Sequence, residues 1–134
     1  MIDNNKTIEE IKLMNPLTWA YVGDCVYELY IREKLVQNTN LKPHMLHIKA
    51  IKKVKASAQA KTLKKIYENL NDEEKEIVRR GRNAQNHHLP KNASVEEYMY
   101  STAFEALIGF LYLTKNEKRL KEILILSDNN EDVV

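Results

Sequence analysis

The sequence predicts an all-α protein, and three observations lead to that prediction. The 134 residues include only three glycines and three prolines, too few for the many tight turns of a β-sandwich or barrel. Apolar residues recur at helical spacing, and no segment alternates as a half-buried strand would. Start signals precede the periodic segments, including Asn15-Pro16 as N-cap and first helical residue and the capping box Ser94-Val95-Glu96-Glu97.

The first half of the chain is expected to form a short helical turn, one long helix, and then a second and a third helix. A short amphipathic turn begins at Thr7, and a long helix runs from Pro16 to about Gln37. After a loop at 38–40, helical spacing resumes at Lys42-Pro43 and continues to Leu70. The pattern allows, but does not require, a break near Ala56-Ser57.

Three further helices are expected in the second half. Asn71-Asp72 caps a short helix from Glu73 to Arg80, and Gly81 is expected to end it. The capping box at Ser94 begins a helix that extends to about Thr114, and Asn116 caps a last helix. The remaining expectations are a polar loop at 82–92, an end of the last helix near residue 126, and an acidic, frayed tail at 127–134.

Length and composition predict one soluble domain over residues 1–134, with its core at about 15–125. The chain has the size of a typical single domain, and its lone cysteine excludes an internal disulfide framework. The sequence contains no apolar run near 20 residues, so no membrane span is predicted. The first ten residues carry acids and no apolar segment, so we expect no signal peptide and a cytoplasmic location.

The charge is distributed unevenly, although the net charge is only +2. Residues 34–91 carry +9, whereas the two flanks together carry −7. No acid occurs between Glu33 and Glu68, a segment that holds nine lysines. Such a polarised domain is typical of a surface that binds a polyanion, with nucleic acid the favoured partner. The alternative is that these lysines only solvate exposed helix faces.

Three carboxylates occur within otherwise uncharged helical segments. Asp24 and Glu28 are the only charged residues between Asn15 and Arg32, and Glu105 is the only one between Glu97 and Lys115. Helices that are apolar on nearly all sides are buried, so we expect all three acids to be buried, and each then needs a cation, a base or a proton.

The acids are expected to converge on a metal ion. Gly23 and Gly109 would allow the two helices to approach closely beside them. Mg²⁺ suits one or two carboxylates supplemented by water and phosphate oxygens, and it would support hydrolysis of phosphodiesters.

Several structural alternatives remain open for these residues. Glu28 could pair with Arg32 one helical turn away, or an acid could bridge to a histidine. The histidines at 44, 47, 87 and 88 do not match a standard zinc spacing. Cys25 lacks a basic neighbour and is expected to be a buried, inert thiol.

An ordered set of motifs resembles the ribonuclease III catalytic domain. The set comprises Tyr21-Val22-Gly23-Asp24, Arg80-Gly81-Arg82-Asn83-Ala84, Pro90-Lys91-Asn92 and Tyr100 to Gly109. The resemblance covers about residues 15–125. It is strongest to Mini-ribonuclease III, the short bacterial branch of the family, which lacks a double-stranded-RNA-binding domain.

The resemblance implies roles for individual residues. Asp24 matches the family's invariant aspartate, and Glu105 matches its essential metal-binding glutamate. The chain departs from full-length ribonuclease III at Leu17, Ala20 and Thr102, where that pattern has acids, and Mini-ribonuclease III shares these losses. Few protein ligands then remain for the metal, with Glu28 and Thr102 as supporting residues around it.

The resemblance further implies a homodimeric, Mg²⁺-dependent endoribonuclease acting on double-stranded RNA. Tyr21 would fill a pocket on the partner subunit. Cleavage would leave 5′-phosphate and 3′-hydroxyl ends, and the family role is maturation of the 23S ribosomal RNA precursor. Whether a ribosomal protein presents the substrate stays open. The residues expected to hold RNA are Lys49, Lys52, Lys55, Gln59, Arg79, Arg82 and Asn83.

A second hypothesis from a different functional class is a non-catalytic, dimeric RNA-binding module on the same fold. The acids missing at Leu17, Ala20 and Thr102 are consistent with it. Burial of Glu105 would favour the enzyme, because a pure binding module has no reason to bury an unpaired carboxylate.

Overall fold

The computed structural model describes residues 2–84 and 94–128, and every regular element in these ranges is helical, as the sequence predicts. The elements are α1 (Ile8–Lys12), α2 (Pro16–Asn38), α3 (Pro43–Val54), α4 (Ala56–Ile66), the 3₁₀ turn η1 (Tyr67–Asn69), α5 (Asp72–Asn83), α6 (Val95–Leu113) and α7 (Glu117–Ser127). No helix in the described ranges is long and apolar enough to cross a membrane.

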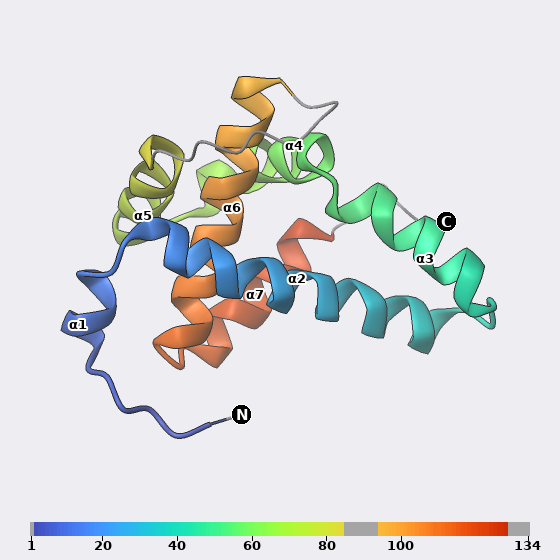
Figure 1. The fold of residues 1–134 in the computed structure, drawn as a ribbon, viewed down its shortest axis with the longest axis horizontal. Helices are drawn as coiled ribbons and strands as arrows, with labels where there is room; N and C mark the ends of the chain where they lie inside the picture. The colour runs from blue at the N-terminus through green and yellow to red at the C-terminus, as the bar shows by residue number, and fades with distance from the viewer. Residues whose placement is uncertain (1, 85–93, 129–134) are drawn as a thin grey trace.

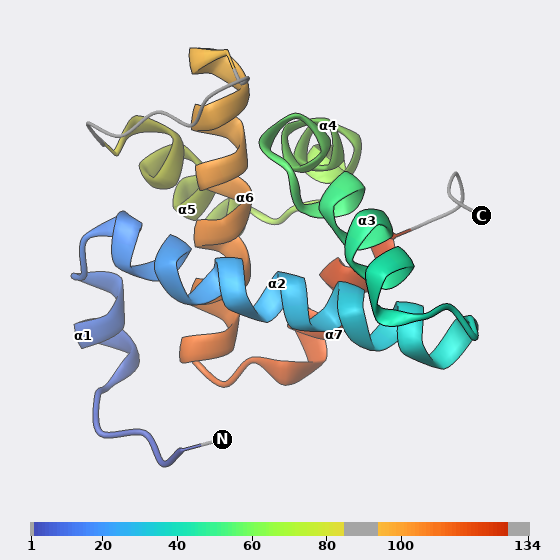
Figure 2. The ribbon, with the colours of Figure 1, turned by 45° about the vertical axis from the view of Figure 1, so that its right-hand side comes forward.

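Helix α6 is the centre of the fold, and α2, α4 and α5 pack around it (Figures 1 and 2). From Ser101 to Leu111 every residue of α6 except Glu105 is buried. The core therefore surrounds this helix, with Phe104 fully buried and its ring 4.8 Å from that of Tyr27 of α2 in an edge-on contact. Helix α2 crosses α6 in both views, and this crossing positions the site described below.

The helix boundaries confirm most expectations. They settle the break that the sequence left open near Ala56-Ser57, and they correct the predicted end of α5. Helices α3 and α4 are separate and share Lys55 as the residue between them. Gly81 does not end α5, because the helix continues through it to Asn83. A Cβ at Gly81 would lie 2.8 Å from the Cβ of Ala106, so the glycine allows α5 to pack closely on α6.

The frayed tail was predicted to begin at residue 127, which is one residue too early because α7 includes Ser127. Ser127 is the buried last residue of α7, and its hydroxyl donates to the Ile123 carbonyl at 2.7 Å. Asp128 forms an ion pair with Lys34 and accepts a hydrogen bond from the Tyr30 hydroxyl at 3.4 Å. The rest of the predicted tail lies outside the described residues.

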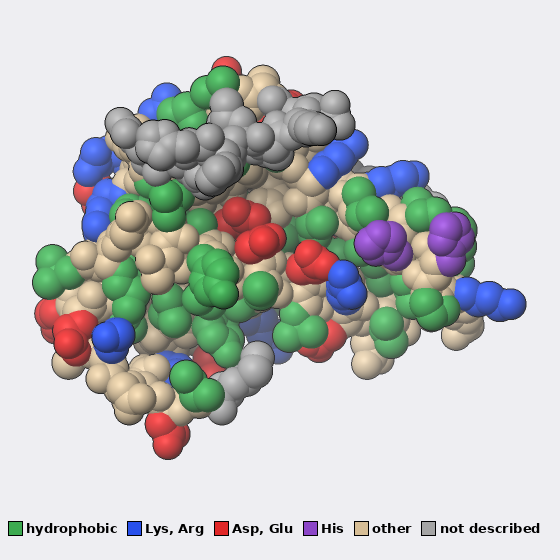
Figure 3. All heavy atoms as spheres, in the orientation of Figure 1, with side chains coloured by type: hydrophobic (Ala, Val, Ile, Leu, Met, Phe, Trp, Pro, Cys, Tyr) green, Lys and Arg blue, Asp and Glu red, His purple; other side chains and the backbone are tan. Residues whose placement is uncertain are grey.

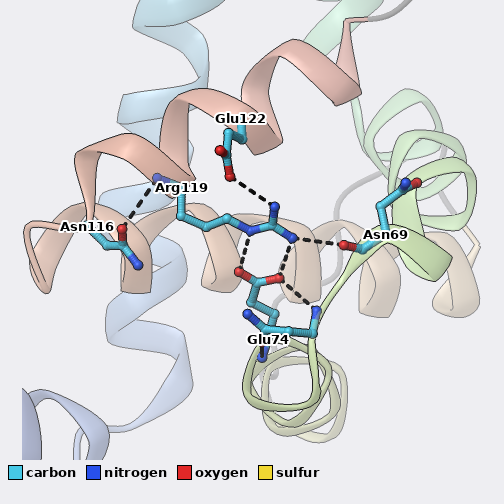
Figure 4. A network of polar contacts seen from close by, with 6 residues as sticks. Asn69, Glu74, Asn116, Arg119 and Glu122 are labelled. Carbon is cyan, nitrogen blue, oxygen red and sulfur yellow. Dashed lines mark hydrogen bonds and ion pairs between the residues drawn. The ribbon is translucent and has the colours of Figure 1, made fainter.

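A buried ion pair joins α5 to α7 (Figure 4). Glu74 is only 3% exposed, and Arg119 donates to its carboxylate through Nε at 2.7 Å and Nη2 at 2.9 Å. Arg119 also donates to the Asn69 carbonyl at 2.8 Å, and the Asn71 amide donates to Glu74 as part of a capping box. Burial would raise the pKa of Glu74, but the hydrogen bonds from Arg119 and Asn71 outweigh it and the pKa is lowered.

Replacing Arg119 with methionine is expected to lower the free energy of unfolding at pH 7 by about 3 kcal/mol, because it leaves Glu74 buried without its cation. The loss should shrink as the pH falls towards 4, since protonation then removes the uncompensated charge. Urea unfolding at pH 7 and pH 4 measures both effects. Arg79→Met is the matched control, because Arg79 forms an exposed pair with Glu76. Equal effects of the two variants would contradict the prediction.

Candidate active site

Two glycines bring α2 and α6 into backbone contact. A Cβ at Gly23 would lie 1.8 Å from the Glu105 carbonyl oxygen, and a Cβ at Gly109 would lie 1.8 Å from that of Trp19. Only glycine fits at either position, because no L side chain can approach a backbone atom this closely. The predicted close approach is therefore confirmed. It places Asp24, which follows Gly23, beside Glu105.

Asp24 and Glu105 face each other in a cleft of about 400 Å³ between α2, α4 and α6, here called the carboxylate cleft. Figure 3 shows acidic side chains gathered in the middle of this face, where α2 crosses α6. The lining residues are Leu17, Ala20, Tyr21, Asp24, Val54, Ala56, Gln59, Tyr98, Ser101, Thr102 and Glu105. The structure thus brings together predicted site residues from both ends of the chain.

The surroundings of Glu105 strongly raise the pKa of its carboxyl group. Burial, with the neighbouring charge of Asp24 and a hydrogen bond between the two carboxyls, raises the pKa of Glu105 from 4.5 to about 8. A hydrogen bond with Gln59 opposes this rise. A carboxyl that retains a proton at neutral pH beside a second acid is typical of a site that accepts a cation in exchange for that proton.

The metal-binding interpretation fits the donors present. Mg²⁺ binds through one or two carboxylates and keeps several waters, and the cleft offers two carboxylates beside open volume. No group of three or more His, Cys, Asp or Glu residues with metal-binding geometry occurs within the described ranges. Asp24 and Glu105 are therefore the two side chains in the cleft that would hold the ion.

All three acids are less buried than the sequence indicated, and Glu105 is half-buried on α6. Asp24 is exposed and Glu28 is half-buried, and Cys25 is exposed instead of forming a buried thiol. Glu28 accepts a hydrogen bond from Nε of Arg32 at 2.9 Å and does not line the carboxylate cleft. This is the helical pair that the sequence left open, so Glu28 is corrected from a residue around the metal to a surface ion pair.

Burial on α2 was overestimated because the outward face of this helix is apolar but is not covered by the rest of the chain. Tyr21, predicted at a dimer interface, is 79% exposed, and Leu29 and Val36 further along the helix are 46% and 59% exposed. The helix is apolar all round, but the single chain covers only one side of it. Apolarity predicted burial correctly for the covered face alone.

Gln59 was expected to contact RNA, and the structure corrects this. Its side chain is 1% exposed and lies between α4 and α6, where Nε2 donates to the Val54 carbonyl at 2.9 Å. Its second contact is with Glu105, while Oε1 is buried without a hydrogen-bond partner among the described residues. Because both neighbours of the amide nitrogen are acceptors, the amide orientation is set, and Gln59 tethers Glu105 to the α3–α4 junction.

Gln59→Leu is expected to weaken binding of Mn²⁺, used as a probe for Mg²⁺, by roughly 10- to 100-fold, as loss of residues that orient metal ligands does elsewhere. Calorimetric titration of the protein with Mn²⁺ measures this. The matched control is Gln37→Leu, the same substitution at an exposed position of α2. An unchanged Mn²⁺ affinity in a folded Gln59→Leu protein would contradict the tether.

The other predicted RNA-binding residues are exposed or half-buried but do not line the carboxylate cleft. Lys55 lies between two lining residues, Val54 and Ala56. Arg79 and Arg82 line a separate hollow between α4, α5 and α6, and Arg82 stacks on the Tyr100 ring at 5.5 Å. Lys49 and Lys52 line a third, larger hollow, and Asn83 is the exposed last residue of α5.

The described histidines do not line the carboxylate cleft, whereas three further residues of α6 do. His44 and His47 are exposed on α3, and the histidines at 87 and 88 lie outside the described residues together with Pro90-Lys91-Asn92. Thr102 lines the carboxylate cleft as predicted. Ser101 and Tyr98 also line it and were missed, although they lie four and seven residues before Glu105 and so share its helical stripe.

Comparison with known proteins adds independent information. Residues 17–116 match the ribonuclease III domain. The chain is 50% identical over 121 residues to Mini-ribonuclease 3 of Thermoanaerobacter sp. (strain X514), covering 90% of this chain and 85% of that one. It is 46% identical over 123 residues to Mini-ribonuclease 3 of Staphylococcus aureus, covering 90% and 92%.

A solved structure has the same fold. The crystal structure of a protein from Fusobacterium nucleatum superposes with a TM-score of 0.77 at 35% sequence identity, covering 86% of this chain and 92% of that one.

Proposed function

The chain belongs to the ribonuclease III family, and on that premise we propose that it is a Mg²⁺-dependent endoribonuclease that cleaves double-stranded RNA. The observation that carries the proposal is the pairing of Asp24 with Glu105, whose pKa is raised, in the carboxylate cleft. The resemblance of the sequence motifs assigns both residues to the family's metal site, and the family is one of endoribonucleases.

Asp24 and Glu105 would hold the metal in this proposal, with Gln59 orienting Glu105. When bound, Mg²⁺ activates water for attack on the scissile phosphate and offsets the charge that develops there. The walls of the cleft, Leu17, Ala20 and Thr102, carry no charge, which leaves room for water and phosphate oxygens to complete the coordination.

We further propose a homodimer formed through the outward face of α2. Tyr21, Leu29 and Val36 present an exposed apolar stripe that a second copy would cover. A two-fold axis through this face would place two carboxylate clefts near each other, one for each RNA strand. The expected products carry 5′-phosphate and 3′-hydroxyl ends.

The RNA would be gripped through its phosphates. Lys55 lies beside the carboxylate cleft, and Arg79, Arg82 and Asn83 lie at the end of α5. Arg79 is engaged with Glu76 at the surface, so its contact with RNA requires exchange of one anion for another. These cationic groups suit recognition by shape and backbone, as is usual for double-helical RNA.

We propose the 23S ribosomal RNA precursor in the cytoplasm as the substrate, because the resemblance to Mini-ribonuclease III implies this role and relatives at 46–50% identity carry the name Mini-ribonuclease 3. A ribosomal protein bound to that precursor is the additional partner to be tested. Incubating the protein with duplex RNA and with each single strand, with and without Mg²⁺, tests the core of the proposal. Binding without cleavage under all conditions would favour the non-catalytic RNA-binding module instead.

The raised pKa of Glu105 makes metal binding dependent on pH. Binding of Mn²⁺ at pH 7 is expected to release close to one proton, because Glu105 must ionise to hold the ion. The apparent affinity should rise with pH and level off above about pH 8. Titrations in buffers of different ionisation enthalpy count the proton. Release of none at pH 7, or an affinity independent of pH between 6 and 8, would contradict the prediction.

A further inference from the structure

A hollow larger than the carboxylate cleft lies between α2, α3, α4 and the end of α7, and half of its lining residues are lysines. It has a volume of about 730 Å³, and we call it the lysine cleft. Its basic lining residues are Lys49, Lys52, Lys53, Lys61, Lys64 and Lys65. Lysines appear along the upper right of Figure 3, over α3 and α4.

Three of the six lysines that line the lysine cleft have no ion-pair partner within the described ranges. Asp128 is the only acid among its lining residues, and it already forms an ion pair with Lys34. Lys64 pairs with Glu96 at 3.0 Å. Lys49, Lys52 and Lys61 form no ion pair with any residue of 2–84 or 94–128. A concave surface with such an excess of positive charge attracts a polyanion.

The lysine cleft and the carboxylate cleft lie on different sides of α4. The two share no lining residue. At about 100° per residue, Lys61 and Lys65 are turned roughly 200° and 240° from Gln59, which faces Glu105. A helix is about 10 Å across with its side chains, so α4 separates the two clefts by roughly that width. The lysine cleft therefore offers phosphate contacts that are separate from those beside the carboxylate cleft.

The chemistry of the lining favours phosphates over bases. Tyr27 is the only aromatic residue in the lining, and it is 3% exposed, so it offers no surface for base stacking. Lysine ammonium groups bind phosphate oxygens as point charges without reading sequence.

We propose that the lysine cleft is a second RNA site, which binds the phosphate backbone of a segment that flanks the duplex to be cut. This inference rests on the proposed function, since it takes RNA as the substrate. It implies that the preferred substrate is a structured RNA with an arm beyond the cleaved duplex.

The test measures binding in a Glu105→Gln background, so that the RNA stays intact. Two RNAs are compared by fluorescence anisotropy: a minimal duplex, and the same duplex extended by a single-stranded arm. The variant Lys49→Gln/Lys52→Gln/Lys61→Gln removes three charges from the lysine cleft. The matched control, Lys6→Gln/Lys118→Gln/Lys121→Gln, removes three exposed charges elsewhere, because none of these lysines lines the cleft.

The cleft variant is expected to bind the armed RNA at least about tenfold more weakly than the control variant does. The slope of log affinity against log salt should fall by about 2, because each lost contact with a single strand contributes about 0.7. The loss should be much smaller for the minimal duplex. An equal loss on both RNAs, or no loss beyond that of the control, would overturn the proposal. Failure of the proposed function would appear separately, as absence of cleavage by the wild-type protein.

Discussion

Glu105→Gln is expected to reduce cleavage of duplex RNA by a factor of at least about 100. Residues that only orient a metal ligand contribute roughly 10- to 100-fold, and Glu105 is proposed to be a ligand itself. The glutamine keeps the size of the side chain but cannot supply the negative charge that the metal needs. Single-turnover cleavage at saturating Mg²⁺ measures the effect. Asp24→Asn should have a loss of the same order.

The fold of the Glu105→Gln protein provides the control for this experiment. A carboxyl whose pKa is raised in the folded state lowers stability as the pH rises from about 4.5 to about 8. The metal-free variant should therefore be at least as stable as the wild type at pH 8, with a smaller dependence of stability on pH. Retained cleavage by either variant in its folded form would refute the catalytic assignment.

Glu28→Gln tests whether the surface acid on α2 differs in function from Asp24, the site acid on the same helix. Glu28 pairs with Arg32 and lies outside the carboxylate cleft, so its replacement should leave the binding of Mn²⁺ unchanged. It is thus the matched control for Asp24→Asn in metal titrations.

Gly23→Ala and Gly109→Ala are expected to be the most destabilising small substitutions in the chain. Overpacking a core usually costs about 1–3 kcal/mol, and here the new methyl group would meet backbone at 1.8 Å, which cannot rotate away. The better helix propensity of alanine returns only about 1 kcal/mol. We expect a net loss of 3 kcal/mol or more, at or beyond the upper end of the usual cost.

The glycine variants test the geometry of the site as well as its stability. If α2 and α6 separate to admit the methyl group, Asp24 and Glu105 separate too, and Mn²⁺ affinity should fall in whatever fraction stays folded. Urea unfolding and Mn²⁺ titration measure the two effects. Gly81→Ala provides a graded comparison, because its Cβ would meet a side-chain carbon at 2.8 Å. A smaller loss at Gly23 than at Gly81 would contradict this account.

Several features of the fold could be predicted because their signals are local. The capping box at Ser94 and the caps at Asn15, Asn71 and Asn116 form as expected, since each joins residues two or three apart in the chain. The end of α5 was mispredicted because Gly81 resembles a C-cap locally. Its reason for being glycine is the contact with α6, about 25 residues further along.

The candidate site could be predicted in part for a similar reason. Asp24 and Glu105 stand out as charges in uncharged helices, and the resemblance to ribonuclease III assigned them a role. Gln59 was assigned to RNA because it lies in a lysine-rich helix, but it shares a helical stripe with the buried Leu63 and Ile66, a signal that could have placed it in the core.

By itself, the sequence determined that the protein is helical, where most helices begin, and which two acids are unusual, because helix propensity, capping and periodicity act over a few residues. Only the tertiary structure decided that Asp24 and Glu105 meet, that Glu28 faces Arg32, and that lysines from α3 and α4 form a cleft away from the acids. These outcomes depend on which helix faces are covered, and that is set by the crossing of α2 and α6 at Gly23 and Gly109.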